Sequence, residues 1–104
     1  MTILRMSTLL AGSLLAASAL AATHEVTIVN LAFTPAVLQA QVGDTVVWRN
    51  QDVIDHTATV NQAWEVVIPA GKSASRVLEH VADQTYYCRY HPTMTARLVV
   101  TAKP

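Results

Sequence analysis

The sequence predicts an all-β protein, a β-sandwich of about seven or eight short strands. Apolar and polar residues alternate with a period of two in short runs after residue 23, which is typical of half-buried strands. Turn residues such as Gly, Pro, Asn and Asp separate these runs at intervals of roughly 8–12 residues. No segment in this part of the sequence has a sustained helical period.

The expected strands run from one turn signal to the next. The most regular run puts Val46 and Trp48 on one face, which is expected to be the core face. Val77 is expected in the core for the same reason. Residues 30–35 include a proline, which cannot donate to a strand ladder, and are expected to form a connection. The expected strands cover residues 24–29, 36–42, 45–50, 56–60, 66–68, 73–78, 84–88 and 96–101.

The first 21 residues resemble a secretory signal peptide. Arg5 supplies a positive charge, residues 9–20 form an apolar run, and small residues follow at the positions that a signal peptidase reads. We therefore expect cleavage after residue 21 or 22, a mature domain over residues 22–104, and a periplasmic location. A retained membrane anchor is the alternative, but the apolar run is shorter than the roughly 20 residues that span a bilayer.

Charge and cysteine content restrict the function of this domain. The chain has 7 basic and 7 acidic residues, and removal of Arg5 leaves 6 against 7, a net charge of −1. This balance argues against nucleic acid and against a polybasic membrane surface as partners, and we expect no stable membrane insertion. A domain this small often depends on a disulfide or a metal, and the single cysteine, Cys88, excludes an internal disulfide.

The densest cluster of metal-ligand residues is the segment that contains Cys88, His91 and Met94. Two residues separate each of these side chains from the next, so one metal ion could contact all three. His56, at the start of an expected strand, must come from a neighbouring strand. Two histidines, one cysteine and one methionine are the ligands of a blue-copper electron-transfer site, with the thioether as the weak axial ligand.

Each of these residues has an ordinary alternative explanation. A single buried cysteine usually behaves as a small hydrophobe, an isolated histidine such as His56 or His91 is more often not a ligand, and Met94 alone is more often a core residue. The combination, directly after a Tyr-Tyr strand and before the last strand, favours a metal. Zinc would accept one cysteine and two histidines, but a thioether is a poor zinc ligand.

Two further histidines lie outside this set. His80 is in an expected turn and is interpreted as a solvated residue. If the mature chain begins at Ala22, His24 becomes its third residue. A free amine with a histidine at position three can chelate Cu(II), which makes His24 a secondary candidate.

The chain resembles the cupredoxins, and among them the amicyanins, over about residues 24–102. The C-x-x-H-x-x-M segment is the short ligand loop of that group, whereas plastocyanins and azurins have longer ones. Further agreement is found in residues 42–46, Trp48, the Asp55-His56 step, Tyr86 and Pro92.

The resemblance implies an eight-stranded Greek-key sandwich with one type 1 copper ion at one end. His56, Cys88 and His91 would be the equatorial ligands and Met94 the axial one. His91 would be partly exposed and would serve as the electron port, with an apolar rim around it. That rim would consist of Ile54, Pro69 and Pro92.

By the same resemblance, the protein would be a periplasmic electron carrier that cycles between Cu(II) and Cu(I), and it is not expected to be an enzyme. Amicyanins accept electrons from methylamine dehydrogenase and pass them to a c-type cytochrome. We therefore expect a monomer whose partners are a c-type cytochrome or a periplasmic dehydrogenase, docking transiently near His91.

Three positions depart from the family pattern. Thr57 stands where the family usually has an Asn that ties the two ligand segments together. Residues 82–84 lack the usual turn glycine, and Thr93 replaces an aromatic residue. These differences bear on redox potential and partner choice.

Two other functions are compatible with the sequence. A periplasmic carrier or buffer that delivers copper is the main alternative, but such proteins tend to be rich in exposed Met and His. Of the three methionines only Met94 would remain after cleavage, which disfavours this alternative. The other possibility is a small exported β-domain in which Cys88 is only structural.

Overall fold

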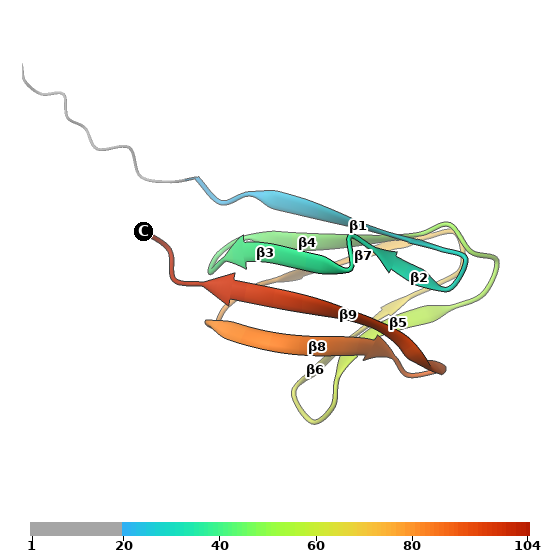
Figure 1. The fold of residues 1–104 in the computed structure, drawn as a ribbon. Helices are drawn as coiled ribbons and strands as arrows, with labels where there is room; N and C mark the ends of the chain where they lie inside the picture. Colours follow the sequence, from blue (N-terminus) through green and yellow to red (C-terminus); the bar gives the residue numbers. More distant parts are fainter. Residues whose placement is uncertain (1–19) are drawn as a thin grey trace, which may run out of the picture.

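The computed structural model describes residues 20–104 of the chain (Figure 1). The predicted signal peptide, residues 1–21, lies almost entirely outside the described residues and stays a prediction. Within the described residues, no helix has the length and apolar character needed to cross a membrane.

Two sheets pack into a β-sandwich, which confirms the predicted fold class (Figure 1). One sheet has four strands in the order β2-β1-β4-β7, and the other has five in the order β3-β9-β8-β5-β6. The pairs β1–β4 and β3–β9 are parallel, and the other pairs are antiparallel. The strands are β1 (Thr23–Val29), β2 (Ala32–Thr34), β3 (Val37–Gln41), β4 (Thr45–Asn50), β5 (His56–Val60), β6 (Trp64–Ile68), β7 (Ser73–Val77), β8 (Ala82–Cys88) and β9 (His91–Thr101).

Two differences from the sequence-based expectation bear on the topology and the candidate site, whereas β6 and β8 only begin two residues earlier than expected. The predicted connection at residues 30–35 contains β2, because Pro35 follows the paired residues and Phe33 can pair with Ile28. The last strand begins at His91 and not at residue 96, so the expected ligand loop is largely a strand. A register shift between Tyr87 and Cys88 lets β8 and β9 remain paired around a tight turn.

The core lies between the sheets, where the expectation for Val46 and Trp48 is confirmed because both are fully buried. The indole N–H of Trp48 donates a hydrogen bond to the Tyr86 hydroxyl oxygen at 3.2 Å. The two rings pack edge to face, with centroids 5.8 Å apart. Burial raises the pKa of Tyr86 to about 12, so this hydroxyl stays protonated and the contact remains neutral.

The core position predicted for Val77 is wrong, because 52% of this residue is exposed. In the antiparallel pairing of β4 with β7, Val46 lies opposite Arg76 and Trp48 lies opposite Ala74. Residues directly opposite share a face, so the inward set on β7 is the one that includes Ala74 and Arg76. The alternation of polar and apolar residues could not show which face of β7 points inward, because Arg76 occupies one of the inward positions.

The two ends of the sandwich are distinct. The start of β9, the end of β8 and the start of β5 meet at one end, whereas β1 begins and the chain terminates at the opposite end (Figure 1). The first end holds the residues that the sequence predicts as metal ligands.

Candidate metal centre

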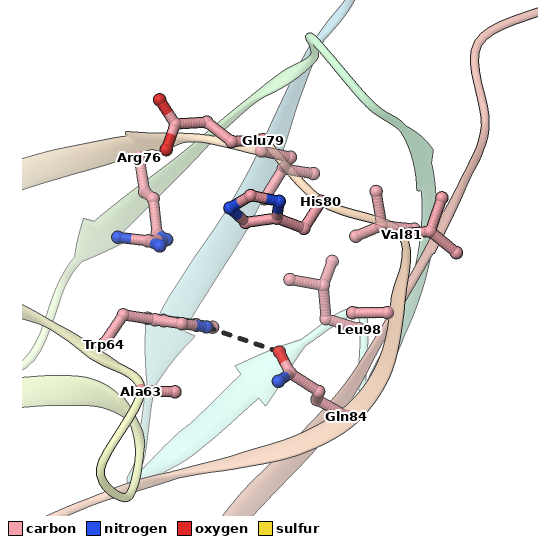
Figure 2. A pocket seen from close by; sticks show the side chains of 11 residues that line it. Ala63, Trp64, Arg76, Glu79, His80, Val81, Gln84 and Leu98 are labelled. Carbon is pink, nitrogen blue, oxygen red and sulfur yellow. Dashed lines mark hydrogen bonds between the residues drawn. The ribbon is translucent and has the colours of Figure 1, made fainter.

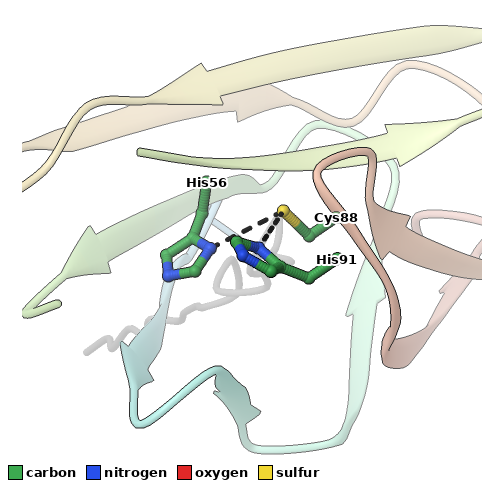
Figure 3. Close-up of side chains that lie close together, drawn as sticks. All are labelled: His56, Cys88 and His91. Atoms are coloured by element: carbon green, nitrogen blue, oxygen red, sulfur yellow. Dashed lines mark hydrogen bonds between the residues drawn. The ribbon is translucent and has the colours of Figure 1, made fainter. Parts of the chain in front are cut away.

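Three predicted ligands converge at the end of the sandwich where β8 turns into β9. The Cys88 sulfur lies 3.6 Å from His56 Nδ1 and 3.7 Å from His91 Nδ1. The three donor atoms lie within 4.8 Å of one another, and their side chains point toward a common point (Figure 3). Among residues 20–104, no other group of three or more His, Cys, Asp and Glu side chains is arranged closely enough to hold a metal ion.

Local pairing explains the convergence of Cys88 and His91. The two residues are directly paired at the last rung between β8 and β9, and only Arg89 and Tyr90 form the turn between them. The register shift at Tyr87 re-aims the end of β8, as β-bulges often do next to functional sites. The Cys-x-x-His spacing is therefore the spacing of a tight turn whose flanking residues face each other.

Burial differs among the three donors. Cys88 and His56 have no exposed surface, whereas His91 is partly exposed. The two imidazole rings lie at 60° to each other, with centroids 5.3 Å apart. The group is therefore closed on the side of His56 and reaches solvent through His91, as the resemblance implies.

Asp52 orients His56, a role that the sequence did not reveal. Its Oδ2 lies 2.8 Å from His56 Nε2, and its carboxylate also accepts the N–H groups of Asn30 and Leu31. The Leu31 N–H contributes most to lowering the pKa of Asp52, with smaller contributions from His56 and Asn30, although burial opposes the shift. An ionised carboxylate only accepts hydrogen bonds, so the proton sits on Nε2 and Nδ1 keeps its lone pair toward Cys88.

Asn30 and Leu31 adopt an unfavourable backbone conformation where they contact Asp52. Both residues have positive φ, 53° and 61°, a region that a leucine rarely adopts. Together they direct two consecutive N–H groups at the Asp52 carboxylate. The only trace of this contact in the sequence is an acidic residue four positions before His56. That spacing does not predict a contact unless the conformation of the intervening loop is known.

Thr57 joins the two segments that carry the ligands. Its N–H donates to the Cys88 sulfur at 3.4 Å, and its hydroxyl oxygen accepts the N–H of Arg89 at 2.8 Å. Thr57 is completely buried. The threonine hydroxyl therefore makes the link between segments that the resemblance assigns to an asparagine.

The fourth predicted ligand, Met94, lies on β9 three residues after His91. It is 5% exposed and shares the inward face of the strand with Ala96 and Leu98. This position keeps its thioether out of solvent at the same end of β9. Its role as an axial ligand stays a prediction.

The predicted rim around His91 is exposed. Ile54 is 41% exposed, and Pro69 and Pro92 are also exposed. Val53, next to Ile54, is 93% exposed. Apolar side chains therefore remain open to solvent at this end of the sandwich.

The two remaining histidines lie away from this group. His80 is exposed in the bend before β8 and lines a hollow of about 280 Å³ together with Trp64, Arg76 and Gln84 (Figure 2). The guanidinium of Arg76 lies 4.8 Å from the centre of the Trp64 ring, and the indole N–H donates to Gln84 Oε1 at 3.3 Å. Polar and charged groups thus cover an edge of the core here.

His24 is paired with an acidic side chain at the opposite end of the sandwich. Its Nε2 lies 2.9 Å from Asp44 Oδ2, and Asp44 Oδ1 accepts the Ala22 N–H at 2.9 Å. The Ala22 N–H, His24 and the Gln41 N–H hold the pKa of Asp44 at about 2. The secondary copper site predicted for His24 remains untested.

The donors fit a copper ion. One sulfur and two imidazole nitrogens suit copper or zinc, and a trigonal arrangement of Cys and two His is typical of blue-copper sites. The orienting carboxylate on His56 is the kind of support that metal-bound histidines generally have. The residues present therefore offer donor atoms of the kind that copper takes, together with a carboxylate that orients His56.

Searches of protein-family models and of curated protein sequences returned no match. Among solved structures, the crystal structure of amicyanin from Paracoccus versutus (Thiobacillus versutus) matches with a TM-score of 0.69 and 18% identity, covering 75% of this chain and 80% of that chain. A mutant amicyanin in its reduced state matches with a TM-score of 0.65 and 24% identity, covering 75% and 81%. Another amicyanin mutant, in a reduced Cu(I) form at pH 4, matches with a TM-score of 0.66 and 24% identity, covering 75% of this chain and 81% of that chain.

These similarities extend over most of both chains and agree with the two-sheet topology. The resemblance expected from the ligand spacing is thus confirmed for the fold. The chain has the cupredoxin β-sandwich fold in its amicyanin-like form.

Proposed function

We propose that this protein is a one-electron carrier that binds one type 1 copper ion through His56, Cys88 and His91, with Met94 as the axial ligand. The observation that carries the proposal is the placement of one sulfur and two nitrogens within 4.8 Å of one another at one end of the sandwich. When bound, copper would supply the one-electron chemistry by cycling between Cu(II) and Cu(I).

The protein would hold its ligands in one geometry through both oxidation states. Cys88 and His91 flank a tight turn between paired strands, and His56 is oriented by Asp52. Such supports restrict ligand movement, which keeps the reorganisation that accompanies electron transfer small. Burial of Cys88 would also protect its sulfur from oxidants in an oxidising compartment.

Electrons would enter and leave through His91, the partly exposed ligand. The exposed apolar residues Ile54, Pro69 and Pro92 would form the contact surface around it. Small apolar contacts favour short-lived complexes, which a carrier needs in order to exchange partners. We propose a c-type cytochrome or a periplasmic dehydrogenase as the partner, export to the periplasm, and no bond-making chemistry.

Visible absorption after addition of copper tests this function. The wild-type protein is expected to turn intensely blue through charge transfer from the Cys88 thiolate to Cu(II), and to lose and regain the colour reversibly on reduction and oxidation. Cys88→Ser should bind copper weakly and stay colourless. A colourless wild-type protein would contradict the proposal, and ready loss of copper to a chelator would favour copper delivery instead.

A further inference from the structure

Four side chains next to the Cys88 turn are linked by hydrogen bonds that run from the protein interior to its surface. The Arg89 N–H donates to Thr57 Oγ1 at 2.8 Å, and Thr57 Oγ1 lies 2.8 Å from Thr59 Oγ1. Thr59 Oγ1 lies 2.8 Å from Glu65 Oε1, and the Arg89 guanidinium pairs with Glu65 Oε2. The chain of contacts thus begins and ends on Arg89.

The acceptor-only carboxylate gives this ring a single direction. Because Glu65 can only accept, the one hydroxyl proton of Thr59 is donated to Glu65. Thr57 must then donate its own proton to Thr59, which leaves a lone pair of Thr57 Oγ1 free for the Arg89 N–H. Every hydroxyl in the ring therefore gives one hydrogen bond and accepts one.

Burial and exposure separate this ring from an ordinary surface ion pair. Thr57 has no exposed surface, and Thr59 is 6% exposed. In the Glu65–Arg89 pair the Glu65 side chain is 26% exposed and that of Arg89 is 57% exposed, whereas both partners of the comparable pair Asp83–Arg97 are more than half exposed. A hydrogen-bonded chain in a low-dielectric interior transmits the loss of one member to the others.

We propose that Thr57, Thr59, Glu65 and Arg89 act as positioning residues that hold the Cys88–Arg89 turn against β5 and so fix the Cys88 sulfur. The anchor point is Thr57, whose N–H donates to that sulfur while its hydroxyl holds the next residue of the turn. The surface pair Glu65–Arg89 is thereby coupled to the metal site. This inference rests on the proposed function only for its effect on copper.

The first test measures amide hydrogen exchange in the metal-free protein, so it does not depend on copper. Thr59→Val keeps the shape of the side chain but removes the middle link, and is expected to speed exchange at the Arg89 amide at least tenfold. Glu65→Ala, a change near the surface, should act in the same direction. Asp83→Ala, which breaks the exposed pair with Arg97, is the matched control and should leave Arg89 unchanged.

The second test measures the reduction potential of the copper-loaded protein. An N–H donor to a thiolate stabilises its negative charge, which matters more in the electron-rich reduced state. Thr59→Val removes the hydrogen bond that holds Thr57 and is therefore expected to lower the reduction potential. Thr59→Ser retains the hydroxyl and should have a potential close to that of the wild type. Asp83→Ala should have no effect on the potential.

Two results would overturn the inference. Exchange at Arg89 within twofold of wild type in both Thr59→Val and Glu65→Ala would show that the ring does not hold the turn. Faster exchange with an unchanged potential in Thr59→Val would leave the ring a purely structural role. A wild-type protein that forms no blue species would instead contradict the proposed function, and the exchange test would still decide the ring.

Discussion

Each end of the sandwich holds a histidine bound to a carboxylate, but only one of these pairs lies at a candidate metal site. His56 is 2.8 Å from Asp52, and His24 is 2.9 Å from Asp44. His56 is completely buried and its other ring nitrogen faces the Cys88 sulfur, whereas the His24 side chain is 24% exposed. A histidine–carboxylate pair is therefore not sufficient for a metal site. What distinguishes the end with His56 is that the turn after Cys88, at the end of another strand, brings a sulfur next to the histidine.

The largest expected difference between the two ends concerns copper binding itself. His56→Ala removes one of three close donors and is expected to abolish the blue colour. His24→Ala, the matched change at the other end, should leave the colour and its intensity unchanged. Visible absorption with copper titration measures both. Equal loss of colour in the two variants would show that the two ends are not functionally distinct.

The next largest effect concerns the core that joins the ends. Trp48→Ala should lower the free energy of unfolding by about 3–5 kcal/mol, because this large side chain is fully buried. Trp64→Ala is the matched control and should cost less, since Trp64 is only partly buried beside the hollow. Urea unfolding of the metal-free variants measures both changes. A larger loss for Trp64→Ala would contradict this account of the core.

A smaller effect is expected from the orienting carboxylates. Asp52→Asn replaces the charged partner of His56, and changes of this kind typically weaken metal affinity about 10–100-fold. Asp44→Asn makes the same change at the opposite end and should leave copper affinity unaltered. Competition titration with a chelator of known affinity measures the two variants. Unchanged affinity in Asp52→Asn would remove Asp52 from the site.

The smallest expected effect is on stability in acid, and it comes from the end without the cysteine. The pKa of Asp44 falls from 3.8 to about 2 in the folded protein. Its contribution is therefore fully present above pH 3.8 and is lost as the pH falls through about 2. Urea unfolding of the metal-free protein between pH 5 and pH 2 should show a shallower decline for Asp44→Asn than for wild type. Parallel curves would contradict this role.

The sequence was informative where a single segment carried the whole signal. The alternation around Val46 and Trp48 identified a core strand, because the largest apolar side chain of that strand, that of Trp48, falls on the same face as Val46. The spacing of Cys88 and His91 indicated that the chain turns back after Cys88, but it did not reveal that β9 already begins at His91.

The sequence was uninformative where the outcome depended on a partner strand. Val77 was misplaced because the pairing of β7 with β4, and not alternation within β7, selects its inward face. Asp52 was missed because two amides from a different turn fix its position. Thr59 and Glu65 become meaningful only once β5 and β6 are paired beside Arg89.

The central claim is that His56, Cys88 and His91 share one copper ion, and X-ray absorption at the copper edge tests it most directly. The wild-type protein loaded with one equivalent of copper is expected to show one short copper–sulfur contact and two copper–imidazole contacts. His24→Ala should give the same spectrum. A copper ion surrounded only by nitrogen and oxygen in the wild-type protein would contradict the account.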